Sequence, residues 1–105
     1  ANAGDCAVRA GQGARAERDL REALALDPRS VVALGAMAEL AYRRGDAFEA
    51  RAFSQRRLAA GPADARALQL ASQIEQKLGD TAAAERYTRR MRAEFGDHPA
   101  QAGDL

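Results

Sequence analysis

The segment VALGAMAELAYRRGDAFEARAFSQRRLAAGP, residues 32–62, decides the fold because it has the pattern of two helices joined by a tight turn. Its first half carries one apolar stripe at helical spacing, made of Leu34, Met37, Ala38 and Ala41. Gly45 is suited to end this helix, and Asp46 is suited to cap the next one. We expect the second helix over 47–59, because proline at 62 cannot continue a helix. Its predicted inward face comprises Phe48, Ala52, Phe53 and Leu58.

The same landmarks recur along the chain with a period of 34 residues. The recurring residues are Gly11, Gly45 and Gly79, then Ala16, Ala50 and Ala84, and finally Pro28 and Pro62. A period of this length with helical patterning indicates a stack of helix pairs. It predicts six helices, near residues 2–10, 14–26, 32–44, 47–59, 65–78 and 81–94. Gly11-Gln12-Gly13 is then the first turn rather than a phosphate loop, since no strand precedes it and no third glycine follows at the required spacing.

The composition favours helices and argues against several functions. Twenty-seven of the 105 residues are alanine, the best helix former. The net charge of +1 lacks the basic excess of a nucleic-acid binder, so we expect no nucleic-acid partner. No apolar run approaches the ~20 residues that a membrane span needs.

Few residues have the chemistry of a catalytic or metal site. Cys6, the single cysteine, is expected to be a small buried hydrophobe, and His98, the single histidine, a solvated tail residue. The run Arg86, Arg89, Arg90 and Arg92 is expected to be a solvated face, because Glu85 and Glu94 flank it. We therefore expect no catalytic residue, no metal, no cofactor and no small-molecule substrate.

The 34-residue pattern resembles the tetratricopeptide repeat (TPR), which has small residues at its eighth and twentieth positions, glycine at the fifteenth and proline at the thirty-second. The matching residues are Gly4, Gly11, Ala16 and Pro28, then Ala38, Gly45, Ala50 and Pro62, then Ser72, Gly79 and Ala84. The resemblance implies an all-α, right-handed solenoid of about three helix-turn-helix units, at residues 1–30, 31–64 and 65–95. The first unit is truncated at its start, and Gly96 stands where proline is expected, so residues 96–105 are predicted to be a tail outside the solenoid.

The resemblance also implies a protein-binding groove without catalysis. In TPR arrays the first helix of each unit lines the groove, and the ninth, twelfth and thirteenth positions face it. Here these positions are Asp5, Val8, Arg9, Glu39, Tyr42, Arg43, Gln73, Gln76 and Lys77. Glu39 and Arg43 form an i,i+4 pair worth only ~0.2–0.5 kcal/mol, as do Asp5 and Arg9. Two interpretations stay open: a helix surface that pairs with itself, or a mixed-charge groove with Tyr42 as an aromatic anchor.

One known TPR partner class is not expected. The clamp for a C-terminal carboxylate uses lysine at the fifth position and asparagine at the ninth. This sequence has Ala1, Gly35 and Gln69 at the fifth position and Asp5, Glu39 and Gln73 at the ninth. The clamp is therefore absent.

A narrower resemblance concerns type IV pilus biogenesis proteins of the PilF/PilW kind. It rests on AELAYRRGD at 38–46, on Ala50-Arg51, Ala60-Gly61-Pro62, Gly79-Asp80 and Ala83-Ala84, and on EFGD at 94–97. Those proteins are TPR lipoproteins that help the pilus secretin assemble, which implies the periplasmic face of the bacterial outer membrane, a secretin or other pilus component as partner, and a lipid anchor upstream of residue 1. The alternative is a TPR module of a cytoplasmic bacterial protein that regulates or anchors a separate domain. Uncovered solenoid ends would in addition allow the chain to associate with itself.

Overall fold

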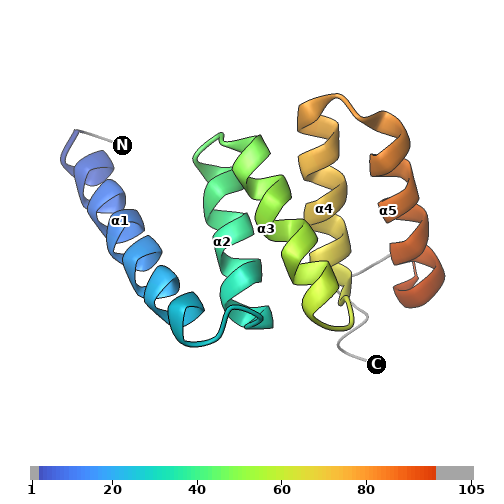
Figure 1. The fold of residues 1–105 in the computed structure, drawn as a ribbon. Helices are drawn as coiled ribbons and strands as arrows, with labels where there is room; N and C mark the ends of the chain where they lie inside the picture. The colour runs from blue at the N-terminus through green and yellow to red at the C-terminus, as the bar shows by residue number, and fades with distance from the viewer. Residues whose placement is uncertain (1–2, 97–105) are drawn as a thin grey trace.

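A computed structural model describes the backbone of residues 3–96 and the side chains of residues 11–96. This part of the chain is a row of five antiparallel helices (Figure 1). They are α1 (Ala3–Leu26), α2 (Val31–Arg43), α3 (Ala47–Ala60), α4 (Ala65–Leu78) and α5 (Thr81–Phe95). α2 packs on α3 and α4 packs on α5, α3 joins the two pairs by packing on α4, and α1 packs mainly on α2. The predicted all-α array of helix pairs is confirmed.

Caps and glycine turns define where the helices begin and end. The carboxylates of Asp46, Asp64 and Asp80 each accept a hydrogen bond from the backbone N–H three residues later, at 3.1, 2.8 and 3.0 Å. Gly45 and Gly79 adopt φ values of 86° and 85°, a left-handed conformation that favours glycine. The predicted equivalence of these two turns is therefore confirmed. α5 ends at Phe95, next to Gly96, and the predicted tail beyond it lies outside the described residues.

The prediction of six helices is wrong at the start of the chain. The two helices expected over 2–10 and 14–26 form one helix, α1, which runs through Gly11, Gln12 and Gly13 without a turn. Gly11 does not adopt the positive φ of Gly45 and Gly79. The residue that follows each glycine explains this difference. Asp46 follows Gly45 and Asp80 follows Gly79, and each aspartate caps the next helix, whereas Gln12 follows Gly11. Glutamine is not among the favoured N-cap residues, so nothing starts a new helix there.

The core is made of small and medium side chains between neighbouring helices. The predicted stripe of α2 is confirmed, since Leu34, Met37, Ala38 and Ala41 are all buried. Leu34, Met37 and Ala38 pack with Phe53 of α3, and Ile74 of α4 packs with Ala41 and Ala50. Ala50 and Ala84 are buried as the repeat predicts, whereas Ala16 on α1 is exposed.

The predicted inward face of α3 is only half right. Phe53 is buried and Leu58 is half-buried, but Phe48 is 72% exposed and Ala52 is also exposed. The buried residues of α3 are Ala50, Phe53, Ser54 and Arg57. This face follows helical spacing, yet Ser54 and Arg57 are polar, so apolar periodicity alone left them out and included the exposed Phe48 and Ala52.

Candidate functional site

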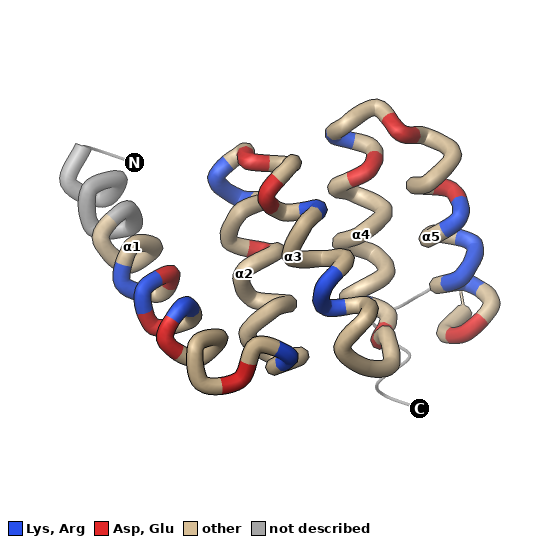
Figure 2. Tube along the Cα trace, in the orientation of Figure 1, with Lys and Arg blue, Asp and Glu red and all other residues tan. Residues whose placement is uncertain are grey.

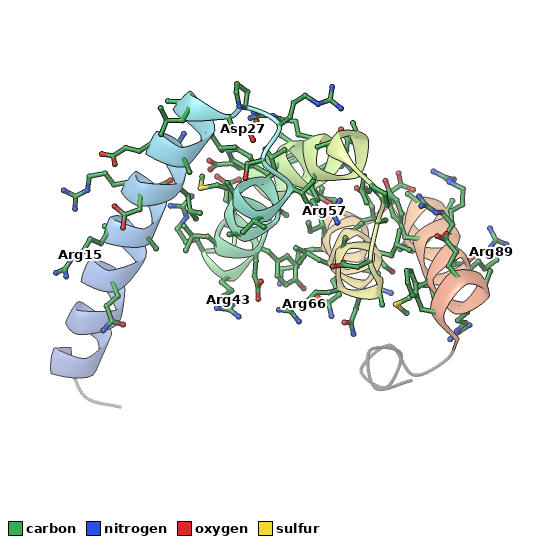
Figure 3. The ribbon with its side chains drawn as sticks, turned by 90° about the horizontal axis from the view of Figure 1, so that it is seen from below. Arg15, Asp27, Arg43, Arg57, Arg66 and Arg89 are labelled. Carbon is green, nitrogen blue, oxygen red and sulfur yellow. The ribbon has the colours of Figure 1, made fainter. Side chains whose placement is uncertain are left out.

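A groove runs between α2 and α4. It consists of two hollows of about 290 and 260 Å³ that share Glu39, Arg66 and Leu70, and we call it the α2–α4 groove. Figure 3 shows Arg43 of α2 and Arg66 of α4 on the same side of the array. The smaller hollow is also lined by Tyr42, Arg43, Gln69 and Gln73. Four of the predicted groove residues, Glu39, Tyr42, Arg43 and Gln73, therefore meet at one place.

Glu39 is the centre of an ion-pair cluster in this groove. Its carboxylate accepts a hydrogen bond from Arg43 Nη2 at 2.6 Å, which confirms the predicted i,i+4 pair. It also pairs with Arg66 Nη2 across the gap between α2 and α4. The side chains of Arg43 and Arg66 are 72% and 70% exposed, so their remaining N–H groups are available to a ligand. Sequence reasoning missed Arg66, because no local spacing rule links it to Glu39.

A second ion pair fixes the position of α4. Arg51 of α3 donates to both carboxylate oxygens of Glu75 of α4, with Nη2 to Oε1 at 2.6 Å and Nε to Oε2 at 3.1 Å. The Glu75 side chain is only 6% exposed. The hydrogen bond to Glu75 raises the pKa of Arg51. A fork geometry of this kind sets the register between two helices, and here it holds one wall of the α2–α4 groove against α3.

Comparison with known proteins identifies the family. The tetratricopeptide repeat profile matches residues 7–74, which is more than half of the chain. The chain belongs to the tetratricopeptide repeat family. The resemblance inferred from the 34-residue period is thereby confirmed. No curated protein and no solved structure gave a match.

The remaining predicted TPR groove residues lie elsewhere. Gln76 lines a separate hollow of about 420 Å³ with residues of α5, among them Thr88 and Arg89. Lys77 is exposed on α4 and lines neither this hollow nor the α2–α4 groove. The side chains of Asp5, Val8 and Arg9, like that of Cys6, lie outside the described residues, as does His98. The groove that the structure describes is therefore built from α2, α3 and α4.

The arginine run on α5 is exposed, as predicted. Figure 2 shows acidic segments on either side of the basic stretch of this helix, and Arg90 Nε donates to Glu94 Oε2 at 3.0 Å. Arg86, Arg89, Arg90 and Arg92 are all exposed. The last helix of the TPR array thus carries mixed charge.

A metal-binding cluster and a helix that could span a membrane are both absent from the described residues. Among them, no three His, Cys, Asp or Glu side chains are grouped so that they could hold a metal ion. Within the same part of the chain, none of the helices is both long and apolar enough to cross a membrane. Outside the α2–α4 groove, some ion pairs join different helices, among them Arg21 with Glu49 and Arg51 with Glu75.

Proposed function

We propose that this TPR chain is a non-catalytic scaffold whose α2–α4 groove holds a segment of a partner protein. TPR repeats are protein-interaction modules. The observation that carries the proposal is the meeting of Tyr42 and Arg43 with Gln69 and Gln73 from the next unit. Tyrosine and arginine are enriched where truncation costs most binding energy, near the centre of an interface. A partner segment lying along the groove must cross this row.

The partner that we propose is the secretin of a type IV pilus. Support comes from the sequence AELAYRRGD at 38–46, which supplies Glu39, Tyr42 and Arg43 to the groove and resembles pilus biogenesis proteins of the PilF/PilW kind. The scaffold would then act at the periplasmic face of the bacterial outer membrane, held by a lipid anchor upstream of residue 1. The alternative partner is a separate domain of a cytoplasmic bacterial protein.

A titration against the secretin tests both levels of the proposal. Tyr42→Ala combined with Arg43→Ala should weaken binding at least about tenfold, because a hot-spot truncation costs upward of ~2 kcal/mol. The control, Arg89→Ala with Arg90→Ala on α5, changes two exposed side chains outside the groove and should leave affinity unchanged. Circular dichroism of both variants establishes that the helices are intact.

The outcomes separate the site from the partner. If secretin affinity falls in the variant with Arg89→Ala and Arg90→Ala, and not in the variant with Tyr42→Ala and Arg43→Ala, the binding site lies on α5 and the groove assignment is wrong. A wild-type chain that does not bind secretin overturns the pilus partner.

A further inference from the structure

The larger hollow of the α2–α4 groove has apolar walls and a buried cation. It lies between the start of α2, the C-terminal half of α3 and the start of α4, and has a volume of about 290 Å³. Its apolar lining comprises Val31, Val32, Ala36, Ala38, Ala67 and Leu70. Val32 is 81% exposed although it lines this hollow, so an aliphatic surface faces the groove. We call this hollow the Arg57 pocket.

Two buried polar side chains of α3 also line the Arg57 pocket. Arg57 is 7% exposed and Ser54 is 6% exposed, and they lie one helical turn apart on the same face. At the position equivalent to Arg57, the first and third units carry the apolar residues Ala23 and Met91. Packing of a TPR unit in this chain therefore does not require a cation there. Gly35 lies beside the Arg57 side chain, since a Cβ at Gly35 would stand 3.8 Å from Arg57 Cδ, an ordinary van der Waals contact.

Arg57 has no acidic partner in the part of the chain that the structure describes. Its Nη1 and Nη2 donate to the carbonyl oxygens of Gly61 and Pro62 at 3.3 and 3.0 Å, and no carboxylate pairs with it. A guanidinium has five N–H donors, so donors remain beyond these two bonds.

Both acidic side chains that line the pocket are already engaged. Asp64 accepts a hydrogen bond from the Ala67 backbone N–H at 2.8 Å, where it caps α4. Glu39 is paired with Arg43 and Arg66. Asp64 is exposed, so its charge is solvated by water, whereas Arg57 is buried and has no ion-pair partner among the described residues. A buried charge is costly unless it is paired, so an anionic ligand would stabilise Arg57.

We propose that the Arg57 pocket binds an aspartate or glutamate side chain of the partner segment, next to an aliphatic side chain that packs on Val32 and Leu70. A guanidinium and a carboxylate form charge-assisted hydrogen bonds, and the Ser54 hydroxyl can donate to the same carboxylate. This inference rests on the proposed function, because the groove continues past the pocket to Tyr42 and a bound chain must run through it. The site differs from a terminal-carboxylate clamp, since its cation comes from the second helix of a unit.

A matched pair of short probes tests the charge requirement. N-acetyl-Glu-Leu-amide and N-acetyl-Gln-Leu-amide differ only in the carboxylate, and both are titrated into the isotope-labelled chain while NMR signals are followed. The glutamate probe should move the Arg57 Nε–H signal and the backbone amides of Ala36 and Leu70. The glutamine probe should bind at least roughly fivefold more weakly, because it loses the charge-assisted bonds. N-acetyl-leucine, whose carboxylate is a chain end, should bind more weakly than the glutamate probe.

Two arginine variants one residue apart provide the control. Arg57→Met introduces the residue that the third unit buries at the same position, so the fold should persist, and it should abolish the preference for glutamate over glutamine. Arg56→Met makes the same change of charge at an exposed side chain that lies over the Phe53 ring and outside the Arg57 pocket. It should retain the preference.

Each other outcome overturns a defined part of the inference. Equal binding of the glutamate and glutamine probes, or a preference that survives Arg57→Met, overturns the carboxylate site. Tighter binding of N-acetyl-leucine overturns the assignment to a side chain. The secretin titration is independent of these results: secretin binding that depends on Tyr42 and Arg43, together with equal binding of the two probes, removes the pocket assignment and leaves the groove.

Discussion

Ala50 lies where three helices meet, so added volume at this residue should destabilise the array. It is fully buried and packs with Ala41 of α2 and Ile74 of α4. We predict that Ala50→Leu lowers the free energy of unfolding by ~1–3 kcal/mol, because the added carbons have no space between three helices. The measurement is the urea midpoint of the variant against wild type. Ala52→Leu on the exposed side of α3 is the control, and equal midpoints for the two variants would contradict the packing described for Ala50.

Single residues were predictable where local backbone geometry selects them. Gly45 and Gly79 need a left-handed conformation and Asp46 caps a helix, so their roles follow from the sequence alone. Phe48 shows the limit of this reasoning, because its apolar character predicted burial and it is exposed. The buried face of α3 includes Arg57, which donates to carbonyl oxygens four and five residues further along the chain. Apolar periodicity cannot anticipate a buried polar group whose partners lie in the following loop.

At the scale of an element, α1 is the helix whose continuity is most directly testable. Gly11 and Gly13 lie inside it without positive φ, and a Cβ at either position would meet nothing within 4 Å. We predict that Gly11→Ala and Gly13→Ala each raise the free energy of unfolding by ~0.5–1 kcal/mol, because alanine loses less backbone entropy in a helix. Thermal unfolding midpoints measure the change.

The control for these two substitutions is Gly45→Ala. Gly45 has φ 86°, where an alanine is strained, so this variant should be less stable than wild type. If Gly11→Ala destabilised the chain as Gly45→Ala does, a turn at Gly11 would exist in solution, and the prediction of two separate first helices would be right.

The packing of α1 against the next helix pair should depend on pH. Glu17 of α1 pairs with Arg44 at 3.0 Å and with Arg21 at 3.1 Å, and both arginines reach Glu49 of α3 at 3.3 Å. The hydrogen bond from Arg44, and next that from Arg21, lowers the pKa of Glu17 below its ordinary value of 4.5. A carboxyl whose pKa is lowered by folding stabilises the folded state above its unfolded pKa, and this stability is lost as the pH falls through the lowered value.

We therefore predict that α1 loses amide-exchange protection below about pH 4.5, before α4 does. Hydrogen exchange followed by NMR across pH 3–6 measures this. Glu17→Gln should remove most of the pH dependence at α1, since it leaves no carboxyl at this position to titrate. Simultaneous loss of protection in α1 and α4 would show that the Glu17 cluster does not hold α1 to the array.

For the whole molecule, the arrangement of helix pairs was more predictable than the groove between them. Glu39 and Arg43 are four residues apart on one helix, and their pairing follows from helical geometry. Glu39 with Arg66 and Arg51 with Glu75 are separated by 27 and 24 residues, and their meeting depends on how α4 docks against α2 and α3. A repeat period determines which helices are neighbours, but it does not determine which side chains bridge them.

The two ends of the array should make the chain associate with itself. At one end Ala16 is exposed on α1, although its equivalents Ala50 and Ala84 are 0% and 1% exposed between helices. At the other end a hollow of about 420 Å³, lined in part by Gln76 and Thr88, opens beside α5. Contacts between two different end surfaces are heterologous and do not close into a symmetric dimer. We predict that the weight-average mass in sedimentation equilibrium rises continuously with protein concentration.

A charge placed on the α1 surface distinguishes this association from nonspecific aggregation. Ala16→Glu puts a carboxylate where a neighbouring helix would pack, so it should reduce the concentration dependence, because an unpaired charge is costly to bury. Ala14→Glu is the matched control: Ala14 is also exposed, and two residues turn a helix by ~200°, so it lies on nearly the opposite side of α1. Equal effects of the two substitutions would place the contact elsewhere. A wild-type mass that stays monomeric at every concentration would mean that the exposed face around Ala16 is stable in water without a partner.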